Sequence, residues 1–113
     1  CEAAAGARDY IEANLTSGFS LEELERATGH CRWQLSRDFR AMFGTSPYRY
    51  LTLRRLDLAR RMMRVGGAIA DVAQDCGFSD QSHFGRMFKQ AYGLTPKAWL
   101  TAVQRPHDHS RTI

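Results

Sequence analysis

Apolar residues recur along the chain at helical spacing, and turn residues divide them into about seven segments. No stretch alternates apolar and polar positions with enrichment in β-branched residues, so no strand is expected. Capping residues such as Ser20 open the segments, and glycines such as Gly29 and Gly44 close them. The expected helices cover residues 3–15, 20–28, 32–43, 47–65, 68–76 and 81–92, and a last one opens at Thr95-Pro96. This pattern predicts an all-α fold.

The third and sixth segments each carry a row of apolar residues along one face. In the third segment these residues follow the spacing i, i+4, i+7, and the sixth has a comparable aromatic row. We expect both rows to face a core, which leaves the opposite faces polar and outward. The rows are Leu35, Phe39 and Met42 in the third segment and Phe84, Phe88 and Tyr92 in the sixth.

An internal repeat is the most informative feature of the sequence. Leu35, Phe39, Gly44, Pro47 and Leu51 recur 49 positions later as Phe84, Phe88, Gly93, Pro96 and Leu100. Upstream, Leu21, Leu24 and Gly29 recur at a shift of 48 as Ile69, Val72 and Gly77. Two copies are too few for a solenoid, which needs at least three units. We therefore expect two related helix-turn-helix units separated by a rod.

The rod is a long helix between the two copies, and it predicts how the chain is organised. It should have about 19 residues and a length of ~28 Å. We expect a first helix-turn-helix subdomain at 1–45, a linker helix at 46–66, a second subdomain at 67–104 and a flexible tail at 105–113.

Charge is distributed unevenly, which favours a nucleic-acid partner. Residues 1–31 hold two arginines against six acidic residues, a net charge of −4, whereas residues 32–64 hold nine arginines against two aspartates, a net charge of +7. All but two of the 16 cationic residues are arginines. Arginine makes planar, bidentate contacts with phosphate and guanine. A solvated arginine-rich helix face would give the same composition, so charge alone leaves both interpretations open.

Several other functions lack the residues that they need. No apolar run approaches the ~20 residues that span a bilayer, and no signal peptide opens the chain, so we expect a cytoplasmic location. Cys1, Cys31 and Cys76 are too scattered for a thiolate metal site, and Cys76 lies on an apolar stripe where a buried thiol is expected. No cofactor is predicted, and His107-Asp108-His109 is only a weak metal motif.

In each unit a short helix, a tight turn and a second helix with a polar face follow one another, as in a helix-turn-helix. The second helix of this motif enters the major groove, where arginine reads guanine and glutamine reads adenine. On this basis Arg37 and Arg86 are expected in the groove, and Trp33 either packs on a thymine methyl or is partly buried. The outward residues are Trp33, Ser36, Arg37 and Arg40 in the first unit and Ser82, His83, Arg86, Lys89 and Gln90 in the second, with Arg32 and Gln81 in the first turns.

The remaining cations are expected to bind the DNA backbone or to be structural. Arg40, Arg49, Lys89 and Lys97 are candidates for phosphate contact, which gives affinity without sequence information. For the arginines of the linker helix we expect pairing with Asp57 or solvation. These are Arg54, Arg55, Arg60, Arg61 and Arg64.

Spaced motifs in both units carry a resemblance to a known family. In the first unit they are Ser20-Leu21-Glu22-Glu23-Leu24, Arg32-Trp33-Gln34-Leu35-Ser36-Arg37-Asp38-Phe39 and Gly44-Thr45-Ser46-Pro47. In the second they are Ile69-Ala70-Asp71-Val72-Ala73, Cys76-Gly77-Phe78, the run from Gln81 to Lys89, and Gly93-Leu94-Thr95-Pro96. Together they resemble the DNA-binding domain of the AraC/XylS family of bacterial transcription regulators over about residues 5–101.

The resemblance implies two recognition helices in successive major-groove segments of one duplex face, ~34 Å apart. The implied partners are a promoter operator in double-stranded DNA, RNA polymerase, and an N-terminal sensing or dimerisation domain expected ahead of Cys1. By motif position, bases would be read by Arg32, Trp33, Ser36 and Arg37 in the first unit and by Gln81, Ser82, His83 and Arg86 in the second.

One position departs from the family pattern. Glu25 stands where the family often has a small residue, such as Ala73 in the second unit. A small residue there lets two helices cross closely. Glu25 is therefore expected either to loosen the first unit or to turn outward.

Two other classes of protein compete with this interpretation. An enzyme would need clustered acids or a nucleophile beside the basic face, but Asp38 and Asp57 stand alone, so no enzymatic activity is expected. A protein-binding helical adaptor would hold an acidic partner with Trp33 and the arginine-rich helix. It would bind DNA without regard to sequence.

Overall fold

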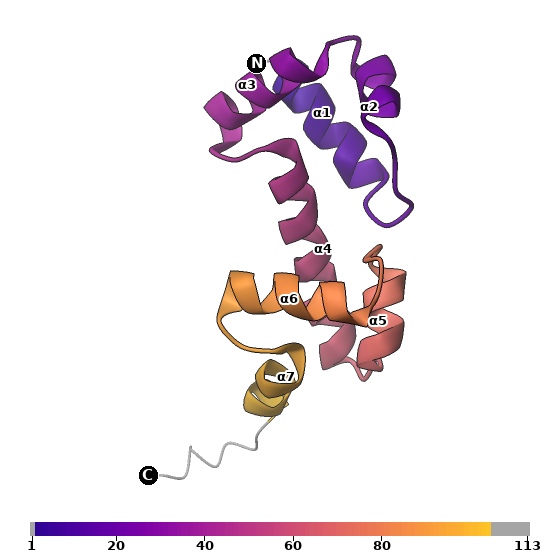
Figure 1. The fold of residues 1–113 in the computed structure, drawn as a ribbon, viewed down its shortest axis with the longest axis vertical. Coiled ribbons are helices and arrows are strands. Elements are labelled where there is room, and N and C mark those ends of the chain that lie inside the picture. Colours follow the sequence, from indigo (N-terminus) through magenta and orange to yellow (C-terminus); the bar gives the residue numbers. More distant parts are fainter. Residues whose placement is uncertain (1, 105–113) are drawn as a thin grey trace. The chain divides into compact units, whose positions relative to one another are not determined.

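The structure, a computed structural model, describes residues 2–104, and every regular element within that range is a helix. The helices are α1 (Glu2–Ala13), α2 (Leu21–Thr28), α3 (Arg32–Phe43), α4 (Pro47–Arg64), α5 (Ile69–Asp75), α6 (Gln81–Tyr92) and α7 (Pro96–Gln104) (Figure 1). The expected all-α fold is confirmed. The helix α1 ends at Ala13 and not at Leu15 as expected. The expected tail at 105–113, with its histidine pair, lies outside the described residues.

The chain divides into two compact units, and the boundary lies between Arg55 and Leu56, inside α4. The long helix is therefore shared, because its first turns belong to the first unit and its later turns to the second. The finer division into residues 1–45, 46–66 and 67–104 stays a prediction.

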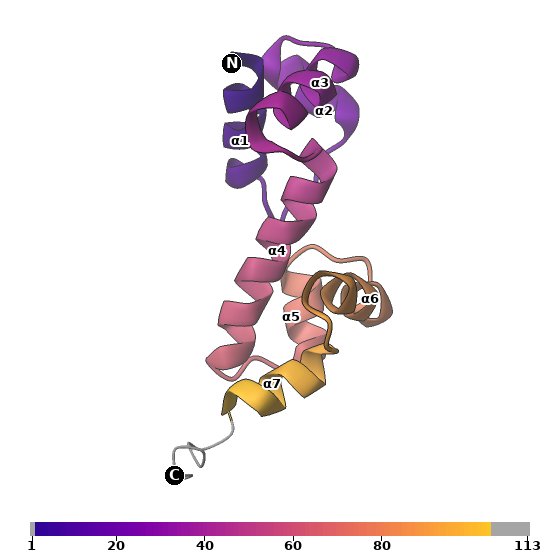
Figure 2. The same cartoon turned by 90° about the vertical axis from the view of Figure 1, so that its left-hand side faces the viewer.

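Small residues on α1 shape the core of the first unit. Ala3, Ala4 and Ala7 are buried, and α1 packs on both α2 and α3. Figures 1 and 2 show α1 beside these two helices. Because the alanine side chain is small, it lets the backbones of neighbouring helices approach closely. The larger buried residues of this core are Ile11, Leu24, Leu35, Phe39 and Leu51, with Tyr10, Leu15, Phe19, Phe43 and Tyr50 packed against them.

Aromatic rings dominate the core of the second unit. Phe84 and Phe88 of α6 are completely buried. The Phe88 ring centroid lies 4.7 Å from that of Tyr92 and 5.7 Å from that of Trp99, so α6 is bound to α7 by ring contacts. The other buried apolar residues here are Leu56, Ala59, Met63, Val72, Ala73, Cys76 and Phe78. The expected burial of the Cys76 thiol is confirmed.

The repeat seen in the sequence returns as matched helix ends. Gly44 ends α3 and Gly93 ends α6, both left-handed with φ of 78° and 81°, a conformation that other residues adopt at a cost. Ser46 Oγ accepts a hydrogen bond from the Arg49 backbone at 3.1 Å, which caps α4. At the equivalent place Thr95 Oγ1 accepts one from the Ala98 backbone at 3.1 Å, which caps α7.

Met42 does not face the core as expected. Its side chain is 48% exposed, whereas Leu35 and Phe39 are buried. The buried row continues with Phe43, whose ring centroid lies 4.6 Å from that of Phe39. The spacing is therefore i, i+4, i+8, with Phe43 packed against the core in the place expected for Met42.

The linker arginines also depart in part from expectation. Arg60 pairs with Asp57 at 2.6 Å, as expected, and its guanidinium lies 4.6 Å from the centroid of the Tyr92 ring. Arg54, however, binds Glu12 of α1, with Nε 2.8 Å from the carboxylate. Arg55 Nε donates to the backbone oxygen of Leu15 at 2.7 Å. These two arginines thus fasten α4 to the end of α1 and the loop after it.

Candidate nucleic-acid interface

The helix α3 has one buried face and one exposed polar face. Leu35 and Phe39 lie in the core, while Ser36, Arg37 and Arg40 on the opposite side are exposed. Trp33 on the exposed side is 80% accessible to solvent. The alternative that Trp33 is partly buried is therefore wrong. The exposed indole lies beside Ser36, Arg37 and Arg40 on the same face, so that face combines an aromatic ring with cationic and polar groups.

The helix α6 repeats this arrangement in the second unit. Its buried side consists of Phe84 and Phe88, which are both completely inaccessible to solvent. Tyr92, expected in the same row, is only partly buried. The exposed residues of α6 are Gln81, Ser82, Arg86, Lys89 and Gln90.

Each outward face carries a shallow, open hollow, and equivalent positions line the two hollows. The hollow on α3 has a volume of about 540 Å³ and is lined by Trp33, Ser36, Arg37, Arg40 and Ala41. The hollow on α6 and the start of α7 has a volume of about 750 Å³ and is lined by Ser82, Gly85, Arg86, Lys89, Gln90, Thr95 and Pro96. Five positions of the second set are those of the first set shifted by 49 residues. Two of these positions hold cations in both units, Arg37 with Arg86 and Arg40 with Lys89, and the other three differ.

His83 is less exposed than its expected outward position requires. Its side chain is partly buried, and its ring centroid lies 5.6 Å from that of Phe78. Nδ1 is shielded from solvent and has no hydrogen-bond partner within the described chain. Its backbone N–H donates to Asp80 Oδ1 at 2.7 Å, so the residue takes part in capping α6.

The two recognition helices, α3 and α6, are capped differently. Asp80 caps α6 with its own side chain, but Cys31 at the equivalent place before α3 makes no side-chain cap. Glu25 supplies it instead, because its carboxylate accepts a hydrogen bond of 2.7 Å from the Arg32 backbone. A carboxylate at a helix N-terminus is favoured by the helix dipole and by the free N–H groups there.

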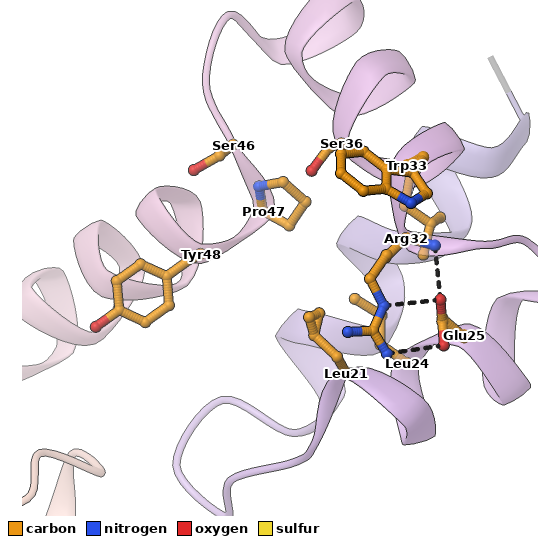
Figure 3. A pocket seen from close by; sticks show the side chains of 10 residues that line it. Leu21, Leu24, Glu25, Arg32, Trp33, Ser36, Ser46, Pro47 and Tyr48 are labelled. Atoms are coloured by element: carbon orange, nitrogen blue, oxygen red, sulfur yellow. Dashed lines mark hydrogen bonds and ion pairs between the residues drawn. The ribbon is translucent and has the colours of Figure 1, made fainter.

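Glu25 also holds the Arg32 side chain (Figure 3). The carboxylate accepts from Nε at 3.1 Å and from Nη2 at 3.3 Å, and Glu22 lies 3.6 Å from the same guanidinium. The hydrogen bond from the Arg32 side chain lowers the pKa of Glu25, and the same bond raises the pKa of Arg32. Glu25 thus turns toward α3, which neither expectation for this residue had included.

A pocket of about 250 Å³ lies beside this ion pair, between α2, α3 and the start of α4 (Figure 3). Leu21, Trp33 and Tyr48 line it and are 42%, 80% and 63% exposed. The sequence reasoning had identified Trp33 but not the two other residues. Only the pairing of segments 12 or more residues apart brings them together, so no local pattern could have found them.

The four candidates for phosphate contact are all exposed. Arg40 lies on α3, Arg49 in the first turns of α4, Lys89 on α6 and Lys97 in the first turn of α7. Within residues 2–104 no three side chains of the metal-binding types gather into a site, and no helix there is long and apolar enough to cross a bilayer.

Known proteins share this sequence and fold. A family profile described as "Helix-turn-helix domain" matches residues 24–102. The multiple antibiotic resistance protein MarA of Escherichia coli is 32% identical over 98 residues, which are 85% of this chain and 77% of MarA. The probable transcriptional regulator LumQ of Photobacterium leiognathi is 35% identical over 89 residues, 78% of this chain. The chain spans only 36% of LumQ.

Solved structures agree with these relatives. An AraC-type transcriptional regulator from Chromobacterium violaceum matches with a TM-score of 0.81 and 28% identity, covering 92% of this chain and 94% of that one. The DNA-binding domain of AdpA, solved with a target DNA, matches with a TM-score of 0.80 over 99% of this chain and 98% of that one. At 23% identity the AdpA match shows the fold alone.

The fold and the paired polar faces define a double helix-turn-helix protein of the transcription-regulator class. Within that class the chain belongs to the AraC-type helix-turn-helix family, as the sequence resemblance implied.

Proposed function

We propose that this chain binds a specific sequence in double-stranded DNA by placing α3 and α6 in successive major grooves, as the output module of a bacterial transcription regulator. The observation that carries the proposal is the duplicated outward face. In each unit a helix with a buried aromatic side presents an arginine, Arg37 or Arg86, and a second cation, Arg40 or Lys89, at equivalent exposed positions. A fold alone would conserve the buried side of such a repeat but has no need of the exposed one.

The exposed residues divide between reading bases and binding phosphates. Arg37 and Arg86 occupy equivalent positions on the two helices and have the planar donors that match guanine. Ser36, Trp33, Gln81 and Ser82 complete the proposed base contacts, and His83 stays a predicted one. Arg40, Arg49, Lys89 and Lys97 bind phosphates and set the register of the helices on the duplex.

The chain's wider partners belong to the same proposal. Regulators of this kind act on a promoter, so we propose RNA polymerase as a partner and the cytoplasm as the location. A linked sensing or dimerisation domain is also proposed. The chain spans 36% of LumQ and 77% of MarA, so these relatives differ in how much sequence lies outside this module.

Selection of bound duplexes from a random pool, followed by footprinting, tests the proposal. Arg37→Ala or Arg86→Ala should each weaken binding to the selected duplex by about 1–3 kcal/mol and relax preference at one base position. Arg26→Ala on α2 makes the same change of charge outside the proposed interface and is the matched control. Equal affinity of the unaltered chain for random and selected duplexes would refute base reading.

The exposed apolar rim of the pocket beside α3 gives some support to the rival function, a protein-binding adaptor. Leu21, Trp33 and Tyr48 are side chains that a partner protein could cover. The rival predicts that Arg37→Ala lowers affinity for all duplexes equally, since charge would be the only attraction. The base-position readout of the same experiment therefore separates the two functions.

A further inference from the structure

Glu25 occupies a position at which the first unit differs from the second. In the second unit the equivalent residue is Ala73, which is buried where α5 packs on α6. A charged carboxylate is costly to bury at such a position, and the Glu25 side chain remains 26% exposed. It reaches across to the start of α3 instead. The first unit has therefore replaced a close helix crossing with a polar connection from α2 to α3.

This connection binds both the backbone and the side chain of Arg32. One carboxylate accepts from the Arg32 backbone at 2.7 Å, from Nε at 3.1 Å and from Nη2 at 3.3 Å. Three donors of one residue thus converge on one acceptor group. These bonds occupy Nε and one Nη2 hydrogen of the guanidinium, so Arg32 could turn that edge toward DNA only by giving up the two side-chain bonds. It would then leave the charge of Glu25 uncompensated beside the phosphates.

We propose that Glu25 is a positioning residue that caps α3 and withholds Arg32 from DNA. The first unit then reads bases through Trp33, Ser36 and Arg37 alone, whereas the second unit retains the contact at its first turn through Gln81. This inference rests on the proposed function. It replaces the base contact that the sequence resemblance implied for Arg32.

Salt dependence of binding measures whether Arg32 is withheld. The chain is titrated with salt on its selected duplex as the unaltered protein, as Glu25→Gln and as the double variant Glu25→Gln with Arg32→Ala. The amide of Gln keeps an oxygen to cap α3 but removes the charge that holds the guanidinium. Released Arg32 adds one phosphate contact, so Glu25→Gln should steepen the slope of log K against log salt by about 0.9. It should also raise affinity for a random duplex up to roughly eightfold at 0.1 M salt.

The double variant identifies Arg32 as the cause. It should return the slope to that of the unaltered chain, because Arg32 contributes no contact there. Asp75→Asn, at the end of α5, makes the same change of charge as Glu25→Gln and should leave the slope unchanged. If the double variant instead binds with a slope shallower by about 0.9 than the unaltered chain, Arg32 contacts DNA in the natural protein and the proposal is wrong. A steeper slope that persists in the double variant would also overturn it.

A measurement without DNA tests the hold on Arg32 by itself. In Glu25→Ala, which copies the second unit, the Arg32 amide should exchange with solvent at least several-fold faster, while the His83 amide, capped by Asp80, should not change. An unchanged Arg32 amide would overturn the capping role. If the unaltered chain failed to distinguish selected from random duplexes, the proposed function would fall. Amide exchange would still decide whether Glu25 holds Arg32.

Discussion

Three apolar side chains of α3 differ widely in exposure although they belong to one helix. Phe39 is completely buried, Met42 is 48% exposed and Trp33 is 80% exposed. Hydrophobicity alone therefore does not determine which of them stabilises the fold. Contact with α1 and α4 does, because those helices cover the side of α3 that carries Phe39. Folding and binding are thus assigned to opposite sides of the same helix.

Phe39→Ala and Met42→Ala should differ sharply in their effect on stability. Removing the buried ring of Phe39 leaves a cavity among Phe43 and Tyr50, so the free energy of unfolding should fall by about 3–5 kcal/mol. Met42→Ala removes a half-exposed side chain and should cost about 0.5 kcal/mol or less. Urea denaturation followed by circular dichroism measures both. A similar loss for the two variants would contradict the assignment of Met42 to the surface.

At the residue scale the sequence predicts which side chains of the candidate site face outward, but not the contacts that these residues make with neighbouring elements. Helical spacing places Ser36, Arg37 and Arg86 on outward faces, and they are exposed. It cannot detect that Glu25 caps α3, because that bond joins residues seven apart across a turn between two helices. It also cannot detect that the His83 ring packs on Phe78, since periodicity alone does not specify how a preceding loop folds back.

Two glycines of the second unit, Gly67 and Gly85, differ in how closely neighbouring atoms pack against them. Gly67 lies in the turn between α4 and α5, and a Cβ there would come within 2.9 Å of both the Met62 oxygen and Val72 Cγ2. Gly85 lies within α6, where a Cβ would meet nothing within 4 Å. The first glycine is required by packing, whereas the second only weakens a helix.

Gly67→Ala and Gly85→Ala should therefore change stability in opposite directions. The methyl at Gly67 must push apart the backbone of α4 and Val72 of α5, which should cost about 1–3 kcal/mol. The methyl at Gly85 stiffens a helix interior at no steric cost and should stabilise the protein by about 0.5–1 kcal/mol. Thermal unfolding of both variants tests this pair. Stabilisation by Gly67→Ala would show that the turn between α4 and α5 is not tightly packed.

The carboxylate of Glu12 on α1 accepts hydrogen bonds from two residues of α4. The hydrogen bond from Arg54 lowers the pKa of Glu12 from its ordinary value of 4.5, burial opposes this, and a hydrogen bond from Tyr50 adds to the lowering. Burial raises the pKa of Tyr50, and its bond to Glu12 raises it further. Ionised Glu12 thus serves as a shared acceptor for two residues of α4.

The stability from Glu12 should consequently depend on pH. Because its pKa is lower in the folded state than in the unfolded state, the contribution is present above about pH 4.5 and is lost as the pH falls through the folded-state value. Glu12→Gln should cost less than about 1 kcal/mol at pH 7, since the pair is about one-third exposed and screened by solvent. Near pH 3 the cost of Glu12→Gln should shrink. At pH 7, adding Arg54→Gln to the Glu12→Gln variant should lower the free energy of unfolding little further. Urea denaturation at the two pH values measures this. An equal cost at both would contradict an ionic origin.

At the scale of elements, the sequence predicts helix ends better than helix contacts. Ser20, Asp80 and the glycines Gly44 and Gly93 mark ends that the structure reproduces, because a cap is a local interaction. The partners of Arg54 and Arg55 lie about 40 residues away in the sequence. Nothing in the spacing of an arginine-rich helix distinguishes a solvated arginine from one that reaches another helix.

For the whole molecule, the duplication means that one chain contains two DNA-binding units, each of which should bind weakly by itself. Each recognition helix presents few candidate base contacts, so neither unit alone should bind with high specificity. Covalent linkage through α4 makes the second binding event intramolecular, which can raise affinity by about 10²–10⁴ without any new contact. The gain requires that the two sites on DNA have the separation that the linked units can reach. Specificity at this scale is therefore a matter of spacing as well as of base sequence.

Changing the spacing of the two half-sites should abolish that gain. The helix α4 runs without interruption from Pro47 to Arg64, so we expect a preferred separation of the half-sites. Inserting 5 base pairs between them turns the second half-site to the opposite face of the duplex, and inserting 10 moves it farther away on the same face by one turn, ~34 Å. Both duplexes should bind at least about 10²-fold more weakly than the selected one, and no more tightly than a duplex with one half-site scrambled. Gel-shift titration at fixed salt gives the four affinities. Retention of full affinity after the 10-base-pair insertion would mean that the affinity does not depend on the separation of the half-sites and would contradict this prediction.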